Sequence, residues 1–215
     1  MNKNLEIFDY KSRLRSSEEL SIRKKEFLKI CEILDEQKIK YFLHTGILLG
    51  AIRNNNLIPW DWDVEVSVFS VDLKPRLFEL QSKLQNSEFN IIKIDKDFNS
   101  IKIDFYGKYP SDTTFYTIYG WYHNKKKKIF GRKKYKIPEH FILNMKKIKF
   151  FERFHFAPYP PEKYLEYMYG NWKKPLQTSN KSLYTSKNYS EENNLYDHLV
   201  FFINSVKRLI LKFIR

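Results

Sequence analysis

An apolar stripe with helical spacing is the first regular pattern along the chain. Four apolar residues recur at intervals of three and four, which places them on one face of a helix. They are Phe27, Ile30, Cys31 and Leu34. Upstream, Ser16 and Glu19 have the spacing of a capping box, which marks the start of a helix. We therefore predict a helix over 16–37, with Cys31 as a packed thiol rather than a nucleophile.

Short apolar and alternating segments follow, and they predict the strands of a sheet. The strands are expected at 39–43, 61–69, 89–94, 101–106 and 113–122. Two helices are expected between them, a brief one over 47–53 and one that begins at Pro75 and runs to about Leu84. Helices and strands in this order predict an α+β fold in which helices cover one side of a sheet.

The remaining part of the chain carries weaker patterns. A short helix is expected at 138–141, a hairpin or single strand at 147–157, and a helix over 161–169 that Gly170 can end. The polar stretch 171–194 predicts irregular structure. The whole predicts one domain over 1–190, made of the helix 16–37, a core over 39–125 and a C-terminal part over 137–175.

The last segment, 195–215, predicts a basic amphipathic helix. Its apolar stripe runs from Leu199 to Phe213, and Lys207 and Arg208 lie on the opposite arc. A helix of this kind suits a membrane surface that carries anionic lipid. The alternatives are a last helix of the core or a contact between two copies of the chain. We favour a peripheral membrane contact through 199–215, because further apolar residues widen the apolar arc.

Charge adds to this picture. The 215 residues include 39 Lys and Arg against 25 Asp and Glu, a formal net charge of +14. The basic residues gather at 125–136, 146–149 and 207–215, which favours anionic partners, although any one such run is equally compatible with a solvated loop. A single cysteine excludes a disulfide framework. With no apolar run near ~20 residues and no secretory pattern at the N-terminus, we expect a cytoplasmic location.

The segment 61–66 carries the clearest candidate chemistry. Asp61, Asp63 and Glu65 alternate along a predicted strand, so their side chains project from the same face. Three carboxylates this close repel one another without a counter-ion, and Mg²⁺ or Mn²⁺ with oxygen ligands supplies one. An exposed edge strand can also alternate acid with valine, so the pattern alone leaves that alternative open.

Residues around this strand fit the same chemistry. Gly46 follows a strand and begins a helix, where backbone N–H groups and the helix dipole favour a phosphate. Arg53, at the other end of that helix, offers a fork for a phosphate oxygen. Asp104 lies between apolar residues of a later strand, as a further metal ligand, a general base or a solvated acid. Together these residues predict a site for an activated phosphate.

The segment 46–66 resembles the signature of the LicD family, whose members include fukutin and fukutin-related protein. The matching residues are Leu48-Leu49-Gly50-Ala51, Arg53, Ile58-Pro59-Trp60-Asp61, Asp63 and Val64. Further similarity lies in 138–141 and 169–172, so the likeness covers roughly 39–175. Two positions depart from the family pattern: Ile47 replaces the usual Ser or Thr, and Glu65 replaces the commoner Asp.

The resemblance implies a nucleotidyltransferase-like fold with helical additions at the C-terminus. It also implies transfer of a phosphorylated alcohol, such as phosphocholine, ribitol phosphate or glycerol phosphate, from a CDP-activated donor to a sugar hydroxyl of a cell-surface glycan. In that scheme Mg²⁺ or Mn²⁺ is held by Asp61, Asp63, Glu65 and Asp104, which also carry catalysis. Gly46 and Arg53 bind the donor's phosphates, and no nucleic acid partner is expected.

Four further residues are candidates for contact with the substrates. His44 adjoins the phosphate turn, and its alternative role is that of a neutral, hydrogen-bonded core histidine. His140 stands at a position that resembles the family, and it could equally cap its helix. Trp60 and Trp62 flank Asp61, so one is expected to pack beneath the strand and the other to stack on a base or sugar.

Two other functions are compatible with the sequence. One is a nucleotidyltransferase that acts on RNA or on a small molecule, which the net charge of +14 favours and the Pro59-Trp60-Asp61 sequence disfavours. The other is a non-catalytic module that binds a membrane or a polyanion, which the presence of all the acids disfavours. Mg²⁺-dependent release of CMP from a CDP-alcohol would separate the phosphotransferase from both alternatives.

Overall fold

The structure is a computed structural model, and it describes residues 12–97, 99–107, 114–178, 180, 183–186 and 188–189. The predicted helix 195–215, and with it the membrane contact through 199–215, lies outside the described residues and stays a prediction. Among the helices that these residues form, none has both the length and the apolar character needed to cross a bilayer.

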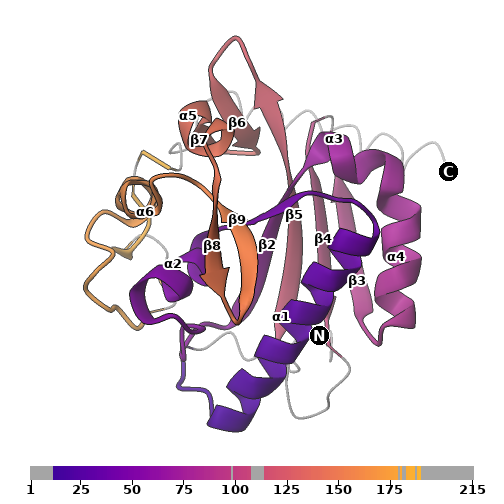
Figure 1. Ribbon diagram of the computed structural model, residues 1–215, viewed down its shortest axis with the longest axis horizontal. Coiled ribbons are helices and arrows are strands. Elements are labelled where there is room, and N and C mark those ends of the chain that lie inside the picture. Colours follow the sequence, from indigo (N-terminus) through magenta and orange to yellow (C-terminus); the bar gives the residue numbers. More distant parts are fainter. Residues whose placement is uncertain are drawn as a thin grey trace, which may run out of the picture.

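A mixed β-sheet forms the centre of the fold (Figure 1). Its strand order is β3-β4-β5-β2-β1-β9-β8, and the hairpin of β6 and β7 extends from β5. The strands are β1 Tyr41–Leu43, β2 Asp63–Phe69, β3 Asn90–Lys96, β4 Ile101–Tyr106, β5 Phe115–Asn124, β6 Ile129–Arg132, β7 Tyr135–Pro138, β8 Lys146–Phe150 and β9 Arg153–Ala157. Strand β2 pairs in parallel with β5, and β1 with β9, whereas the other pairs are antiparallel. The predicted α+β class is confirmed.

Helices α1 (Ser17–Glu36) and α4 (Leu77–Asn86) cover one face of this sheet (Figure 1). The start of α1 is fixed by the predicted capping box, because Ser16 Oγ accepts from the Glu19 backbone and the Glu19 carboxylate accepts from the Ser16 backbone. The predicted apolar stripe of α1 is buried, including Cys31, which is a free thiol. Helix α4 contributes Leu80 and Leu84 to the same core.

The register of β2 separates an apolar face of the sheet from a polar one. Val64 and Val66 are buried, and Tyr116, which pairs with Val64, donates a hydrogen bond to Glu26 of α1. The valines therefore face the α1 side. Because side chains alternate along a strand, Asp63 and Glu65 point to the opposite face. This is the arrangement that the alternation of acids and valines predicts.

Helix α2 (Thr45–Asn54) brings the end of β1 back toward the start of β2. It ends at Asn55, which adopts the left-handed conformation with φ 49°. The chain then turns so closely that a Cβ on Gly50 would lie 2.3 Å from the Asn56 carbonyl oxygen. Gly50 is thus required by the turn that delivers Asp61 to the sheet.

The remaining elements follow the predictions closely, with one exception. The region after β2 forms α3 (Ser70–Leu73), a 3₁₀ turn (Lys74–Arg76) and α4, and the later elements include α5 (Glu139–Leu143) and α6 (Pro161–Tyr169). The stretch predicted as a hairpin or strand at 147–157 is the hairpin of β8 and β9. The exception is the basic run at 125–136, for which no strand is predicted and which forms the turn and most of the two strands of the β6–β7 hairpin.

Candidate active site

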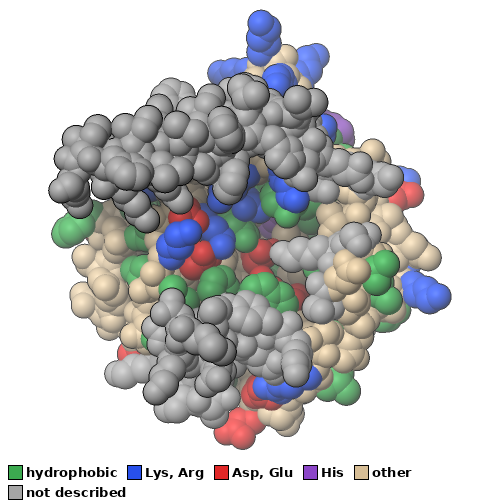
Figure 2. Space-filling view, turned by 180° about the vertical axis from the view of Figure 1, so that it is seen from behind, with side chains coloured by type: hydrophobic (Ala, Val, Ile, Leu, Met, Phe, Trp, Pro, Cys, Tyr) green, Lys and Arg blue, Asp and Glu red, His purple; other side chains and the backbone are tan. Residues whose placement is uncertain are grey.

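A cavity of about 480 Å³ lies on the polar face of the sheet, opposite α1. Most of the predicted site residues line it: Gly46, Arg53, Trp60, Asp61, Trp62, Asp63 and Glu65. Seen from behind, the molecule is hollowed where acidic and basic side chains meet (Figure 2). The cavity thus combines residues from α2, from the loop before β2 and from β2 itself.

Asp61 is held in place by its backbone and by α1. Its carbonyl oxygen accepts a hydrogen bond of 2.6 Å from Arg23 Nη1, and its Oδ1 accepts one of 3.0 Å from the Trp62 backbone. Burial raises the pKa of Asp61 to about 6, and the negative charge of Glu65 adds to this rise. The neighbouring Asp63 carboxyl group acts in the opposite direction and lowers this pKa. Asp61 is thus close enough to Asp63 and Glu65 for both to act on its carboxyl group.

Gly46 lines the cavity and also lies against Asp61, and the phosphate contact that the sequence predicts for it stays a prediction. A Cβ at this position would lie 2.2 Å from Asp61 Oδ2, so the absence of a side chain leaves room for this carboxylate. Asp61 consequently lies against the first turn of α2, where the helix dipole favours a negative charge. The observed position of the Asp61 carboxylate therefore depends on a glycine at position 46.

Asp104 lies farther from the other acids than the prediction of a shared metal shell requires. It is in one row with Glu65, but Thr117 of β5 stands between them, so two strand spacings of together about 10 Å separate their backbones. Its carboxylate accepts from Thr117 Oγ1 at 2.8 Å and forms an ion pair of 2.6 Å with Lys102 Nζ. Asp104 does not line the cavity.

The cavity's donor set suits a hard divalent cation. Asp61, Asp63 and Glu65 all line the cavity and supply carboxylate oxygens. In the part of the chain that the structure describes, no three or more carboxylate, histidine or cysteine side chains converge closely enough to hold a metal ion. The four predicted carboxylates are therefore not assembled into one shell. The neighbouring pair Asp61 and Asp63 fits the magnesium pattern of one or two carboxylates completed by substrate phosphates.

Arg53 and the two tryptophans extend the cavity wall. The Arg53 guanidinium lies 5.8 Å from the centre of a Trp60 ring, and its Nη1 donates to the Trp172 carbonyl oxygen at 3.4 Å. Its Nε donates to Asn54 at 3.0 Å. Trp62 packs on Phe115, with ring centres 5.5 Å apart. Both tryptophans line the cavity, so neither is confined to the core beneath the strand.

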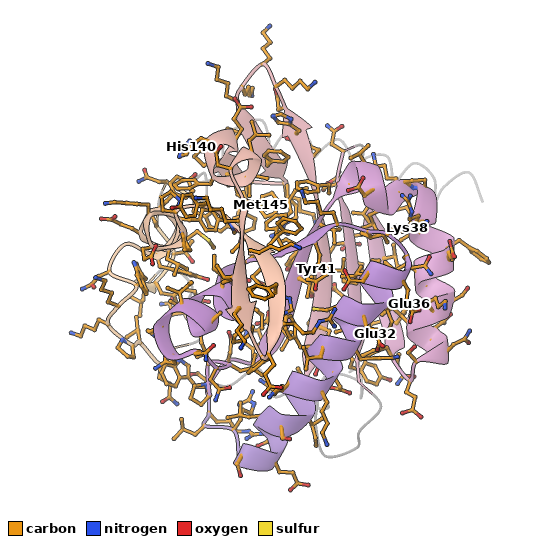
Figure 3. All side chains as sticks on the ribbon, in the orientation of Figure 1. Glu32, Glu36, Lys38, Tyr41, His140 and Met145 are labelled. Atoms are coloured by element: carbon orange, nitrogen blue, oxygen red, sulfur yellow. The ribbon has the colours of Figure 1, made fainter. Side chains whose placement is uncertain are left out.

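The two candidate histidines do not line the cavity. His44 is fully buried beneath it, where its ring contacts Trp121 and its Nε2 lies 3.3 Å from the Tyr189 hydroxyl. Burial holds the pKa of His44 well below its usual range, which favours the neutral core histidine. His140 is exposed on α5 and stacks on Phe141 (Figure 3). Neither histidine reaches the acids through the contacts described here.

The sequence pattern did not single out several residues that complete the cavity. Tyr119 of β5 lines the cavity, and its pKa is raised by burial and then by the negative charge of Glu65. Arg132 of β6 stacks on the Tyr119 ring, and Tyr189 lies in the stretch predicted to be irregular. Arg132 was visible only as one member of a basic run. No local signal distinguished it from its neighbouring lysines.

The chain that builds this cavity matches a known protein family. The family described as "LicD/FKTN/FKRP, nucleotidyltransferase domain" matches residues 38–160, which is more than half of the chain. The chain belongs to the LicD/FKTN/FKRP family. The predicted resemblance is thus confirmed, and members of this family transfer phosphorylated alcohol groups.

Two kinds of relatives of this LicD-family chain illustrate the match. Ribitol 5-phosphate transferase FKRP of Homo sapiens, and likewise that of Mus musculus, is 39% identical over 41 residues, which are 19% of this chain and 8% of the relative. Uncharacterized protein RP689 of Rickettsia prowazekii (strain Madrid E) is 27% identical over 152 residues, 66% of this chain and 52% of the relative. The chain therefore spans less than two thirds of the length of these relatives.

The LicD-family match covers α2, β2 and the acids, but the cavity extends beyond it. The matched residues 38–160 include Arg132, whereas Arg23 precedes the match and Tyr169 and Trp172 follow it. These flanking residues hold or line the same cavity. The site is accordingly built by the family domain together with the segments on either side of it.

Proposed function

We propose that this LicD-family cavity transfers a phosphorylated alcohol from a CDP-activated donor to a sugar hydroxyl of a glycan, with Mg²⁺ or Mn²⁺. One observation carries the proposal: Asp61, Asp63 and Glu65 line a single cavity with Arg53 inside the segment that matches the family. The similarity to ribitol 5-phosphate transferase FKRP supports the same class of reaction.

In the proposed reaction, the sugar hydroxyl oxygen attacks the phosphorus that bears the alcohol. The bond between this phosphorus and the CMP oxygen breaks, and the hydroxyl proton passes to a carboxylate. We assign that proton to Glu65, because it lines the cavity whereas Asp104 is paired with Lys102 outside it. CMP leaves with the electron pair of the broken bond.

The remaining cavity residues bind and orient the reactants in this proposal. Asp61 and Asp63 would hold the metal ion, which when bound neutralises charge on the diphosphate. Arg53 donates to phosphate oxygens as negative charge grows on the departing CMP. Trp60 offers an aromatic face for the cytosine or a sugar ring. Catalysis is then mainly positioning and electrostatic stabilisation, as is usual for phosphoryl transfer.

The proposal is tested with a panel of four CDP-alcohols, and phosphorus NMR follows the consumption of each one. CDP-choline, CDP-ribitol, CDP-glycerol and CDP-ethanolamine are incubated with the protein, Mg²⁺ and a glycan extract. We expect CMP release from one of them, its loss on chelation of the metal, and its loss in Asp63→Asn. Asp95→Asn is the matched control, because Asp95 pairs with Lys93 on β3, away from the cavity.

Two results would contradict this proposal. Asp63→Asn turning over as fast as the parent protein would exclude the acids from catalysis. Extension of an RNA primer with a nucleoside triphosphate, without consumption of any CDP-alcohol, would instead support the alternative nucleotidyltransferase. This second candidate is tested because the net charge of +14 favours binding of a polyanion such as RNA.

A further inference from the structure

Arg132 is a buried arginine at the wall of the cavity. Only 7% of the residue is exposed, and it lines the same cavity as the three acids. It lies at the end of β6, just before the turn of the lysine-rich hairpin. Its neighbours Lys133 and Lys134 are exposed, so Arg132 alone of these three basic residues points inward.

Aromatic rings hold the guanidinium of Arg132 in a fixed position. Its central carbon lies 3.6 Å from the centre of the Tyr119 ring, 4.9 Å from that of Tyr135 and 5.2 Å from that of Trp121. Cation–π contacts of this kind stabilise a desolvated arginine through the face of the guanidinium. They leave the N–H groups in the guanidinium plane able to donate to a ligand. The side chain is therefore preorganised before any ligand arrives.

The charge of Arg132 has no carboxylate partner among the residues that the structure describes. None of the ion pairs formed there includes it, and its buried Nε makes no hydrogen bond. The Tyr189 side chain, which also lines the cavity, lies beside it. A buried guanidinium without a counter-ion is unfavourable, and its remaining donors at the cavity wall suit an anion.

The position of Arg132 relative to the acids defines which anion fits. Tyr119 lies between the two charges, since its ring face carries Arg132 and the Glu65 carboxylate acts on its hydroxyl. A ligand in this cavity therefore meets both carboxylates and a planar guanidinium, because all of them line it. A diphosphate suits this wall, because the guanidinium fork matches two phosphate oxygens and a cation held by the acids would neutralise further charge on it.

We propose that Arg132 is the anion-binding residue that receives the diphosphate of the nucleotide donor. This inference rests on the proposed function, because it takes the donor to be a CDP-alcohol. Arg132 is the second guanidinium in the cavity, beside Arg53. Arg53 donates to a backbone carbonyl oxygen, whereas no hydrogen bond from the Arg132 side chain to a backbone carbonyl is formed among the residues that the structure describes. Arg132 binds the substrate and takes no part in proton transfer.

The inference is tested by calorimetric titration of the full chain with CDP, inorganic pyrophosphate and cytidine in the presence of Mg²⁺. We expect Arg132→Gln to weaken binding of CDP and of pyrophosphate by about 10- to 100-fold, as for lost charged hydrogen bonds, and to leave cytidine unaffected. Lys134→Gln is the matched control. Lys134 lies two residues after Arg132 and is exposed, so the substitution removes the same charge outside the cavity. It should bind all three within about twofold of the parent.

A thermal unfolding experiment with pyrophosphate gives a second readout that does not depend on turnover. Pyrophosphate should raise the melting temperature of the parent and of Lys134→Gln, but not that of Arg132→Gln. Should Arg132→Gln fail to fold, Arg132→Lys replaces it, and loss of the planar fork should still weaken CDP binding. Parent-like binding of CDP by the folded Arg132 variant would overturn the inference.

The outcomes also separate this inference from the proposed function. Parent-like CDP binding by Arg132→Gln, with turnover of a CDP-alcohol by the parent, refutes the role of Arg132 and leaves the function intact. Arg132-dependent binding of pyrophosphate without any preference for CDP supports the anion site and refutes the cytidine donor. Absence of pyrophosphate and CDP binding by the parent would refute the anion site directly.

Discussion

Asp61→Asn should stabilise the protein at neutral pH while removing its activity. The pKa of Asp61 rises from its ordinary 3.8 to about 6, chiefly because of burial and then because of Glu65. Folding therefore disfavours the ionised carboxylate, so the folded protein binds more protons than the unfolded chain between these two values. The asparagine is neutral at every pH, and its Oδ1 can still accept from the Trp62 backbone.

The size of this effect follows from the pKa difference. At about 1.36 kcal/mol per pKa unit, the rise corresponds to at most about 3 kcal/mol. The first turn of α2 beside Asp61 favours the anion by about 0.3–1 kcal/mol, and partial exposure to water screens the repulsion further. We therefore expect Asp61→Asn to raise the free energy of unfolding by about 1–2 kcal/mol at pH 7.5.

The assay is urea denaturation in chelator at pH 4 and at pH 7.5. The penalty from Asp61 is absent below about pH 4 and is complete above about pH 6, so the gain from the substitution should grow across that window. Asp95→Asn is a control of opposite sign, because Lys93 holds the pKa of Asp95 below its usual range. That variant should lose a few tenths of a kcal/mol at pH 7.5. A loss of stability in Asp61→Asn at pH 7.5, or a gain equal at both pH values, would refute the reasoning.

Three further predictions concern the same cavity. Gly46→Ala should lower turnover by about 100-fold or more, because its Cβ displaces the Asp61 carboxylate; unchanged kinetics would contradict the matched fit. The kcat/KM value should fall as the pH drops below about 6, where free Asp61 takes up a proton; a flat profile from pH 5 to 8 would argue against it. Asp104→Asn should reduce the free energy of unfolding by about 1–2 kcal/mol in urea but change turnover less than about tenfold, because Asp104 serves Lys102 and Thr117 rather than the cavity.

Much of the fold could be predicted because its local signals agree with its packing. Ser16 and Glu19 cap α1 as their spacing predicts, and the valines of β2 point to the core as their alternation predicts. Pro161 and Gly170 mark both ends of α6. In each case the residues that give the signal lie in the element that they define, or directly beside it.

The β6–β7 hairpin could not be predicted in this way. Lys125 to Lys128 are exposed at its turn, whereas Phe130 and Ile137 on its arms are buried by contacts with distant elements. Its apolar residues are too few and too widely separated by lysines to give an alternating pattern. For the same reason the sequence does not predict that Arg132 lines the cavity, because only the pairing of β6 with β5 brings it onto Tyr119.

The site shows the same limit. Asp61, Asp63 and Glu65 come from a single segment, so their spacing alone was enough to predict that they share a face. Asp104 comes from β4, and its distance from them depends on strand order, which places β5 and Thr117 in between. The purpose of Gly46 likewise depends on the position of Asp61, fifteen residues later in the sequence but in contact in the fold.

The most direct test of the central claim is the binding of Mn²⁺ to the full chain, followed by electron paramagnetic resonance with CDP present. The parent should bind one ion, with affinity at least about tenfold higher than Asp61→Asn or Asp63→Asn, and Asp104→Asn should bind like the parent. Equal binding by the parent, Asp61→Asn and Asp63→Asn would show that these acids do not form the metal site.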